Sequence, residues 1–562
     1  MPMPVAAPVP MHDKPRHATG SDGSRRALAW LTLFGLVLFL PWLGARDLWN
    51  PDEPRYAEVA REMGADGRFL VPHFNGEIYT QKPPLFFWAI NASALVTGGF
   101  NEWAARLPSA LAALGTTLLV FAIGRRLFEP RVAWMAALVY ATSFKVLWQA
   151  RVAQIDMLLT FLVTLSAWCW LRGYQESSVR DYRLFFLVAG LATLTKGPVG
   201  LLPFLLSALV FLWVSDRKEE IRAMQVGRGL LIWGGVVAAW LLAATLQAGT
   251  GYLRELVLTQ NLTRYFDPGS TPVMSGHLKP WYHYLTTLPV DFLPWSVLLP
   301  AAFWVPWREG AWRREPGYRL AACWTVVPIL FFSLSSAKRS VYLLPGFPAA
   351  ALLAAFLLDT VARTGRRHRL AAVVPFALVG VLLLVAAALL PLEAAQRPEA
   401  EVVGQGTILV LAALLGIVGC AALAGARAAS RGRLVLAAAL VAAAMAPIGP
   451  IAFGWALGRA DPLKSVRPVT DELLRRLGPE EEYGVFPRLD GRALFYTRRL
   501  ARELPDAQAL HRFAAEGGRW VVARRDAMAR VEGPPPLEVV AGDGSDDEGA
   551  ALLRLLPAEP PR

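Results

Sequence analysis

The sequence is poor in cysteine and in lysine, and it lacks the short alternating strands of a membrane barrel. Its three cysteines, Cys169, Cys323 and Cys420, all fall in apolar stretches. Their positions show no spacing typical of a metal site or a disulfide framework, so we interpret them as small core residues. The missing alternation excludes an outer-membrane barrel. Lysine supplies only 8 of the 57 basic residues, which makes the place of each lysine informative.

Apolar residues are abundant instead. They make up 55% of the chain, against about 45–50% in soluble domains, and the mean hydropathy is +0.38. Long apolar segments recur over the first 457 residues, many near the roughly 20 residues that span a bilayer. The sequence therefore predicts an all-α polytopic membrane protein with about 13 transmembrane helices. The expected spans are 27–45, 103–124, 132–148, 156–171, 184–195, 198–214, 229–247, 289–306, 320–335, 341–360, 370–391, 406–425 and 434–457.

The net charge of +13 is explained by where the arginines lie rather than by nucleic-acid binding. Arginines gather in alternate connections between the expected spans, and cytoplasmic loops are the ones enriched in such residues. The basic connections are 125–131, 172–183, 217–228, 308–319, 363–369 and 427–433, together with Arg25 and Arg26. This pattern predicts a cytoplasmic N-terminus and an outer C-terminus.

Three regions follow from this topology. Residues 1–26, rich in proline, are predicted to be a disordered cytoplasmic tail. Residues 27–457 form the transmembrane domain, with long outer loops at 46–102 and 248–288. In the outer loop, the apolar segment 84–98 is expected to lie at the interface. Residues 458–562 alternate strand-like and helical patterns and predict a small outer α/β domain.

Polar residues cluster in the loops assigned to the outer face, where intramembrane or interfacial charges are usually functional. Lys82, Lys196, Lys279 and Lys338 lie there against the positive-inside bias. Lysine is a compact charge suited to phosphate, so these lysines favour a site for an anionic lipid-phosphate substrate. The alternative for each is anchoring to headgroups by snorkelling.

Other polar residues also have structural alternatives. Asp52 and Glu53 could cap the helix that follows them, because acids favour a helix N-terminus. Asp156 could simply pair with Arg151, five residues earlier. His277 could be an ordinary loop histidine.

Several strings resemble the bacterial aminoarabinose transferases, membrane glycosyltransferases of the GT-C class that are akin to protein O-mannosyltransferases. The resemblance covers roughly residues 27–350 in order, and it depends on the combination of motifs. The strings are 52–58 (DEPRYAE), 79–83 (YTQKP), 195–198 (TKGP), 261–266 (NLTRYF), His277 ahead of 280–282 (PWY), and 338–345 (KRSVYLLP).

The resemblance implies a polyprenyl-phosphate-linked sugar as donor, a periplasmic site in the bacterial inner membrane, and lipid A as the acceptor of the best-known members. It implies that Asp52 is the catalytic carboxylate and Asp156 a second functional acid. The implied donor-site residues are Arg55, Tyr56, Tyr79, Lys82, Lys196, His277 and Tyr342, with Lys338 as a further phosphate-binding cation. Lipid A, another glycolipid, a polysaccharide and a protein all stay open as acceptors.

One residue departs from the family pattern. Gln81 precedes the Lys-Pro pair where the aminoarabinose transferases typically have glutamate. Glutamine keeps hydrogen bonding but loses the charge, so it disfavours a divalent metal held by this residue and His277; no cofactor is assigned. The change also raises the prospect of a different sugar. The competing function is a transporter or flippase of a lipid-linked anion, which predicts midplane charges and an internal repeat.

Overall fold

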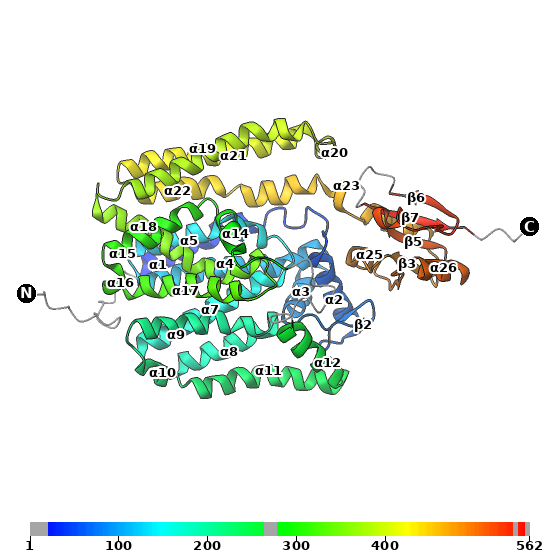
Figure 1. Ribbon diagram of the computed structural model, residues 1–562, viewed down its shortest axis with the longest axis horizontal. Coiled ribbons are helices and arrows are strands. Elements are labelled where there is room, and N and C mark those ends of the chain that lie inside the picture. The colour runs from blue at the N-terminus through cyan, green and yellow to red at the C-terminus, as the bar shows by residue number, and fades with distance from the viewer. Residues whose placement is uncertain (1–20, 264–277, 543–548, 557–562) are drawn as a thin grey trace, which may run out of the picture.

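The computed structural model describes residues 21–263, 278–542 and 549–556. Most of the long helices run side by side along one direction, and the strands of the C-terminal region gather at one end of the bundle (Figure 1). The first half of the bundle contains α1 (Ser21–Phe39), α2 (Asp52–Asp66), β1 (His73–Phe74), β2 (Glu77–Ile78), α3 (Leu85–Thr97), α4 (Glu102–Leu127), α5 (Pro130–Ala141), α6 (Phe144–Gln149), α7 (Ile155–Glu176), α8 (Val179–Lys196), η2 (Pro198–Gly200), α9 (Leu202–Val214), α10 (Glu219–Ala223), α11 (Val226–Ala248), α12 (Thr250–Arg254) and the π-helix η3 (Glu255–Thr263). The second half contains α14 (His283–Asp291), η6 (Ser296–Leu298), α15 (Leu299–Arg308), α16 (Ala311–Arg314), α17 (Pro316–Leu334), η7 (Ser340–Gly346), α18 (Phe347–Thr364), α19 (Leu370–Ala394), α20 (Glu399–Val403), α21 (Gln405–Ser430), α22 (Leu434–Met445) and the π-helix η8 (Ile448–Ala456).

The helical membrane class predicted from the sequence is confirmed, but fewer segments than expected qualify as complete spans. Among the described residues, eight helices are long and apolar enough to cross a bilayer, or nine if one bent pair counts as a span. The eight are Glu102–Leu127, Ile155–Glu176, Val226–Ala248, Pro316–Leu334, Ser340–Thr364, Leu370–Ala394, Gln405–Ser430 and Leu434–Ala456.

Breaks in the helices account for most of the difference. The segment 132–148 is divided between α5 and α6 near Ser143, and 289–306 is bent by 119° between α14 and the helix that begins at Ser296. The segment 198–214 starts with a short 3₁₀ turn after Gly197 and is too short to qualify. Proline lacks the backbone N–H that donates a helical hydrogen bond, and short polar side chains form hydrogen bonds with the backbone that compete with those of the helix. Apolar composition alone therefore predicts more unbroken spans than the described residues contain.

The start of the first helix also differs from expectation. Residues 1–20 of the predicted tail lie outside the described residues, but α1 begins at Ser21, so 21–26 are helical. Helix α1 therefore carries Arg25 and Arg26 within its first two turns, and its polar start sets it apart from the eight apolar spans.

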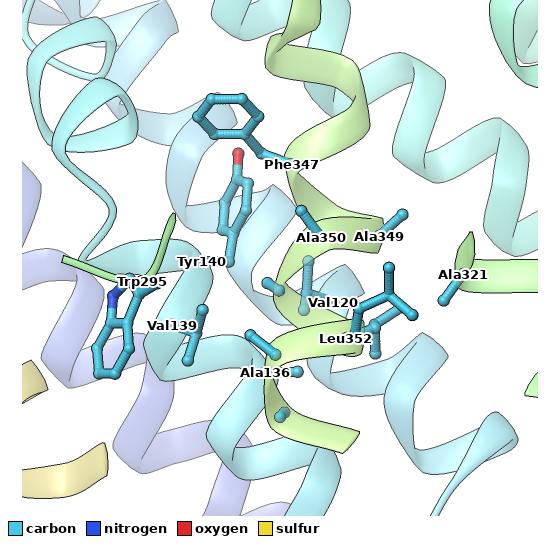
Figure 2. Close-up of a cluster of buried hydrophobic side chains, with 14 of the residues drawn as sticks. Val120, Ala136, Val139, Tyr140, Trp295, Ala321, Phe347, Ala349, Ala350 and Leu352 are labelled. Carbon is cyan, nitrogen blue, oxygen red and sulfur yellow. The ribbon is translucent and has the colours of Figure 1, made fainter. Parts of the chain in front are cut away.

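Helix α18 forms the centre of the membrane core. Its residues Phe347–Val361 are buried, and Ala349 and Ala350 face the helices around them (Figure 2). Small residues let helix backbones approach closely, which is the main packing device when lipid is as apolar as the core. Tyr140 of α5 and Trp295 fill the same cluster (Figure 2). Helix α18 thus holds η7, the segment before it, in a fixed place.

The C-terminal region contains the predicted strands and helices. Its elements are α23 (Asp461–Lys464), α24 (Arg467–Arg476), β3 (Tyr483–Phe486), α25 (Gly491–Thr497), β4 (Arg502–Glu503), α26 (Ala507–Ala515), β5 (Trp520–Arg524), α27 (Arg525–Met528), β6 (Leu537–Ala541) and β7 (Ala550–Leu555). The five strands form one sheet in the order β4-β3-β5-β7-β6. Strand β3 pairs parallel with β4 and β5, whereas β7 pairs antiparallel with β5 and β6.

This small domain rests directly on the first outer loop. A Cβ on Gly491 would lie 2.9 Å from the backbone nitrogen of Arg55, so α25 and α2 approach closely only because that residue is glycine. Asn75 exchanges two 2.8 Å hydrogen bonds with the backbone of Ala501, and Tyr496 accepts a 2.9 Å bond from the Leu48 amide. The domain therefore fixes the position of α2.

Candidate active site

Asp52 is the first residue of α2, which begins immediately after Pro51. Its side chain is buried, with 8% of the residue exposed. The carboxylate oxygen Oδ2 accepts hydrogen bonds from the guanidinium of Arg339 at 2.9 Å and from Nε2 of Gln154 at 2.8 Å. Burial raises the pKa of Asp52, but the positive charges of Arg339, Arg55 and Lys82 outweigh it and hold this pKa below its usual value. Asp52 is therefore a carboxylate at neutral pH.

The neighbouring acid Glu53 has a different role. It forms ion pairs of 2.7 Å with both Arg46 and Arg106, and it accepts the Ala153 amide at 3.0 Å. Burial opposes its ionisation, yet these arginines lower the pKa of Glu53 to about 2. No side chain caps α2, so the capping alternative for Glu53 is wrong. Glu53 ties the start of α2 to the spanning helix α4.

Asp156, at the start of α7, lies beside the last residue of α8. Its oxygen Oδ1 forms a short ion pair with Nζ of Lys196. The same ammonium lies 4.6 Å from the centre of the Tyr342 ring in η7, which adds a cation–π contact. The alternative pairing of Asp156 with Arg151 is wrong, because Arg151 donates to the carbonyls of Phe39 and Pro41. Three predicted residues from three elements thus meet at one place.

Two buried tyrosines, Tyr56 and Tyr79, belong to the same region of the site as Asp52 and Asp156. The pKa of Tyr56 lies well above its usual value because of its burial, with further contributions from the nearby charges of Asp52 and Asp156. Tyr79 donates a 3.4 Å hydrogen bond to Oε1 of Gln81. Lys82 donates to the carbonyl of Gln81 at 2.9 Å, and its charge acts on Asp52. The first loop therefore brings its tyrosines and lysine to the same cluster.

The remaining predicted residues divide into three cases. Arg55 is half-buried within electrostatic range of Asp52. Lys338 is buried and donates to the carbonyls of Ser335 and, at 3.1 Å, Lys279, so it braces the segment before η7. His277 lies outside the described residues, as do residues 264–266 of the string 261–266.

Arg339 and Gln154 are site residues that sequence reasoning did not assign. Arg339 is the direct cationic partner of Asp52, and it also lies within electrostatic range of Asp156. Arg339 directly follows Lys338, which the sequence assigns to the outer face, and this position could have marked it as a site residue. Gln154 gave no signal, because it is an uncharged residue in the turn before α7.

The described residues do not gather a donor set for a metal. Within residues 21–263, 278–542 and 549–556, no three His, Cys, Asp or Glu side chains are placed to share an ion. Oδ2 of Asp52 is occupied by Arg339 and Gln154, and Gln81 supplies a neutral amide oxygen in place of a carboxylate.

Comparison with known sequences finds similar proteins among the lipid-linked sugar transferases. Residues 81–244 match the family model for dolichyl-phosphate-mannose-protein mannosyltransferase. The undecaprenyl phosphate-alpha-4-amino-4-deoxy-L-arabinose arabinosyl transferase of Edwardsiella ictaluri is 33% identical over 356 residues, which are 62% of this chain and 62% of the relative. A second arabinosyl transferase, from Pseudomonas fluorescens Pf-5, is 30% identical over 403 residues, which are 70% of this chain and 67% of the relative. The chain spans about three fifths of the length of the first curated relatives it matches.

Solved structures show the same fold. The crystal structure of ArnT from Cupriavidus metallidurans bound to undecaprenyl phosphate aligns with a TM-score of 0.77 at 22% identity, covering 97% of this chain and all of that one. The apo oligosaccharyltransferase of Archaeoglobus fulgidus aligns with a TM-score of 0.53 at 14% identity, covering 91% of this chain and 71% of that one. The GT-C architecture predicted from the sequence is thereby confirmed.

Proposed function

The chain belongs to the bacterial aminoarabinose transferase family of GT-C membrane proteins, and we propose that it moves a sugar from a polyprenyl phosphate to an envelope acceptor. The observation that carries the proposal is the buried carboxylate of Asp52 among cations, at the end of the helix bundle where the outer loops meet. A carboxylate for proton removal and cations for a departing phosphate are the two groups that such a transfer needs.

Asp52 is the proposed general base. Both hydrogen bonds described for its carboxylate go to Oδ2, which leaves Oδ1 to take the proton of an acceptor hydroxyl. As that oxygen bonds to the anomeric carbon, the bond from this carbon to the donor phosphate breaks on the opposite face. The configuration inverts, and the polyprenyl phosphate leaves with the bonding electrons.

The cations around Asp52 are the proposed binding groups for the leaving phosphate. Lys82 and Arg55 act on Asp52 electrostatically, and Lys196 is held beside Tyr342 by Asp156. Asp156 therefore positions the Lys196 ammonium. Negative charge grows on the phosphate in the transition state, so fixed cations stabilise that state more than the ground state.

Transfer is tested directly with membranes that contain the full chain. They are given radiolabelled undecaprenyl phosphate aminoarabinose or undecaprenyl phosphate hexose together with lipid A, and label is followed into the acceptor. We expect label in the acceptor from one donor, and the preferred donor tests whether the neutral Gln81 selects an uncharged sugar. Absence of transfer from both donors to lipid A and to total envelope glycolipid, with normally inserted protein, would contradict the proposal.

The multi-pass chain is placed in the bacterial inner membrane, and we propose that its N-terminus is cytoplasmic and that the Asp52 face is periplasmic. The alternating arginine pattern and the polyprenyl-phosphate chemistry of the relatives support this orientation. A variant without native cysteines is labelled with a membrane-impermeant maleimide at Ile78→Cys, which lies at an exposed position. Labelling of intact spheroplasts at this position is expected, and labelling at Arg431→Cys in its place would reverse the orientation.

A further inference from the structure

A pocket of about 570 Å³ lies between α5, α18 and the start of α22, at the end of the bundle remote from Asp52. Helix α18 begins just after Tyr342 and runs for 18 residues, about 27 Å at the usual rise per residue. The pocket residue Asp359 is near the far end of that helix. The pocket therefore belongs to the opposite membrane face and takes no part in the proposed transfer.

Arginines dominate the charge around this pocket. Asp359 has 1% of its residue exposed and forms ion pairs with Arg131 and, at 2.9 Å, with Arg363. Arg433 also lines the pocket, is exposed, and its guanidinium makes no hydrogen bond or ion pair with any of the described residues. Arg369 reaches the same corner, where it donates to the Ser430 carbonyl at 2.7 Å.

The acids near the pocket do not neutralise these arginines. Asp359 lines the wall, and Glu129 lies within electrostatic range of it. Two acids thus face the four arginines, which leaves a net charge of about +2 at this corner.

The rest of the pocket wall is apolar and continues onto an exposed apolar surface. Met135 and Leu358 line its interior, while Val435 and Leu436 on α22 are 51% and 44% exposed. A basic mouth joined to an exposed apolar helix face matches the two parts of a phospholipid, its anionic headgroup and its acyl chains. Basic pockets between helices on the cytoplasmic side bind such headgroups in other membrane proteins.

We propose that this pocket binds an anionic phospholipid, with its phosphate at Arg433 and Arg131 and its acyl chains along Val435 and Leu436. Charge-assisted hydrogen bonds from guanidinium to phosphate supply the affinity. The alternative is a purely structural role, in which the ion pairs of Asp359 with Arg131 and Arg363 only hold α5 against α18. Arg433 takes no part in those ion pairs, so a structural role would not require it. Arg433 is therefore the residue that separates lipid binding from a purely structural cluster.

The test measures thermal unfolding of the full chain in detergent as dioleoylphosphatidylglycerol, dioleoylphosphatidylcholine or glycerol phosphate is added. The variant is Arg433→Gln, and the matched control is Arg431→Gln, an exposed arginine two residues earlier that does not line the pocket. We expect phosphatidylglycerol alone to raise the melting temperature of the wild type and the control. Arg433→Gln should need about fivefold more of this lipid for the same rise, because one basic group near a lipid surface contributes about that factor.

Three outcomes overturn the proposal. The first is equal stabilisation of Arg433→Gln and the wild type by phosphatidylglycerol. The second is equal stabilisation by phosphatidylcholine, which shows a general need for lipid. The third is equal stabilisation by glycerol phosphate, which shows an anion site without a lipid. Arg433→Gln should melt like the wild type when no lipid is added, because its guanidinium has no partner to lose among the described residues.

Discussion

Replacing Glu53 by glutamine should destabilise the protein at its first outer loop without changing the groups proposed to react. The pKa of Glu53 falls from the usual 4.5 to about 2, because Arg106, Arg46 and the Ala153 amide stabilise the buried carboxylate. A shift of this size corresponds to about 3 kcal/mol of folding free energy. That contribution is fully present above about pH 4.5 and is lost as the pH falls toward 2, because the unfolded chain binds a proton at Glu53 more tightly than the folded chain does.

Glu53→Gln leaves two nearly buried guanidinium groups without their shared acid. Breaking such a pair from one side costs about 3–5 kcal/mol, so we expect a melting temperature several degrees below that of the wild type at pH 7. The assay is thermal unfolding in detergent followed by fluorescence-detected size exclusion, with Asp52→Asn as the adjacent control. A normal melting temperature together with lost transfer in Glu53→Gln would refute the reasoning, because it would make Glu53 a participant in the reaction.

Three further perturbations test the framework around Asp52. Arg339→Gln removes the 2.9 Å partner of Asp52, so the buried carboxylate should hold its proton to higher pH and the acid limb of the rate–pH profile should move upward; an unchanged profile would contradict this pairing. Gly491→Ala places a methyl group against the backbone of α2, and we expect transfer to fall about tenfold or more; the surface control is Gly406→Ala, whose added methyl group would meet no atom within 4 Å. Lys145→Met removes an ammonium that bonds Ser340, the first residue of η7, at 2.8 Å and Asp291, the last residue of α14, at 3.2 Å. Because these contacts hold η7 in place, kcat should fall while the KM for the donor changes little. A normal kcat would show that other contacts hold η7.

The sequence located the acids and lysines of this site because local signals mark them. Asp52, Lys196 and Tyr342 each stand next to a helix break, where polar groups can leave the membrane core, and the arginine pattern assigned those breaks to one face. Helix α8 returns antiparallel to α7, which brings Lys196 to Asp156. Periodicity and charge therefore predict which groups share a face.

Pairings across that face could not be predicted. Arg339 and Asp52 are 287 residues apart, and only the packing of α18 and the first loop decides that they meet. Arg151 is close to Asp156 in sequence but lies before the turn that starts α7, so its side chain reaches the backbone of α1 and the residues after it. Among the described residues, fewer of the expected spans are unbroken helices, for a related reason. Breaks such as the bend of 119° between α14 and the helix from Ser296 depend on tertiary contacts as well as on proline.

The role of Asp52 is the central claim, and the initial rate of sugar transfer by Asp52→Asn tests it most directly. The variant keeps the size of the side chain and its acceptor oxygen, but it cannot take a proton from the acceptor. We expect the rate to fall by about 100-fold or more while expression and melting temperature stay close to the wild type. Undiminished transfer by Asp52→Asn, at equal amounts of folded protein, would contradict the assignment of Asp52 as the catalytic base.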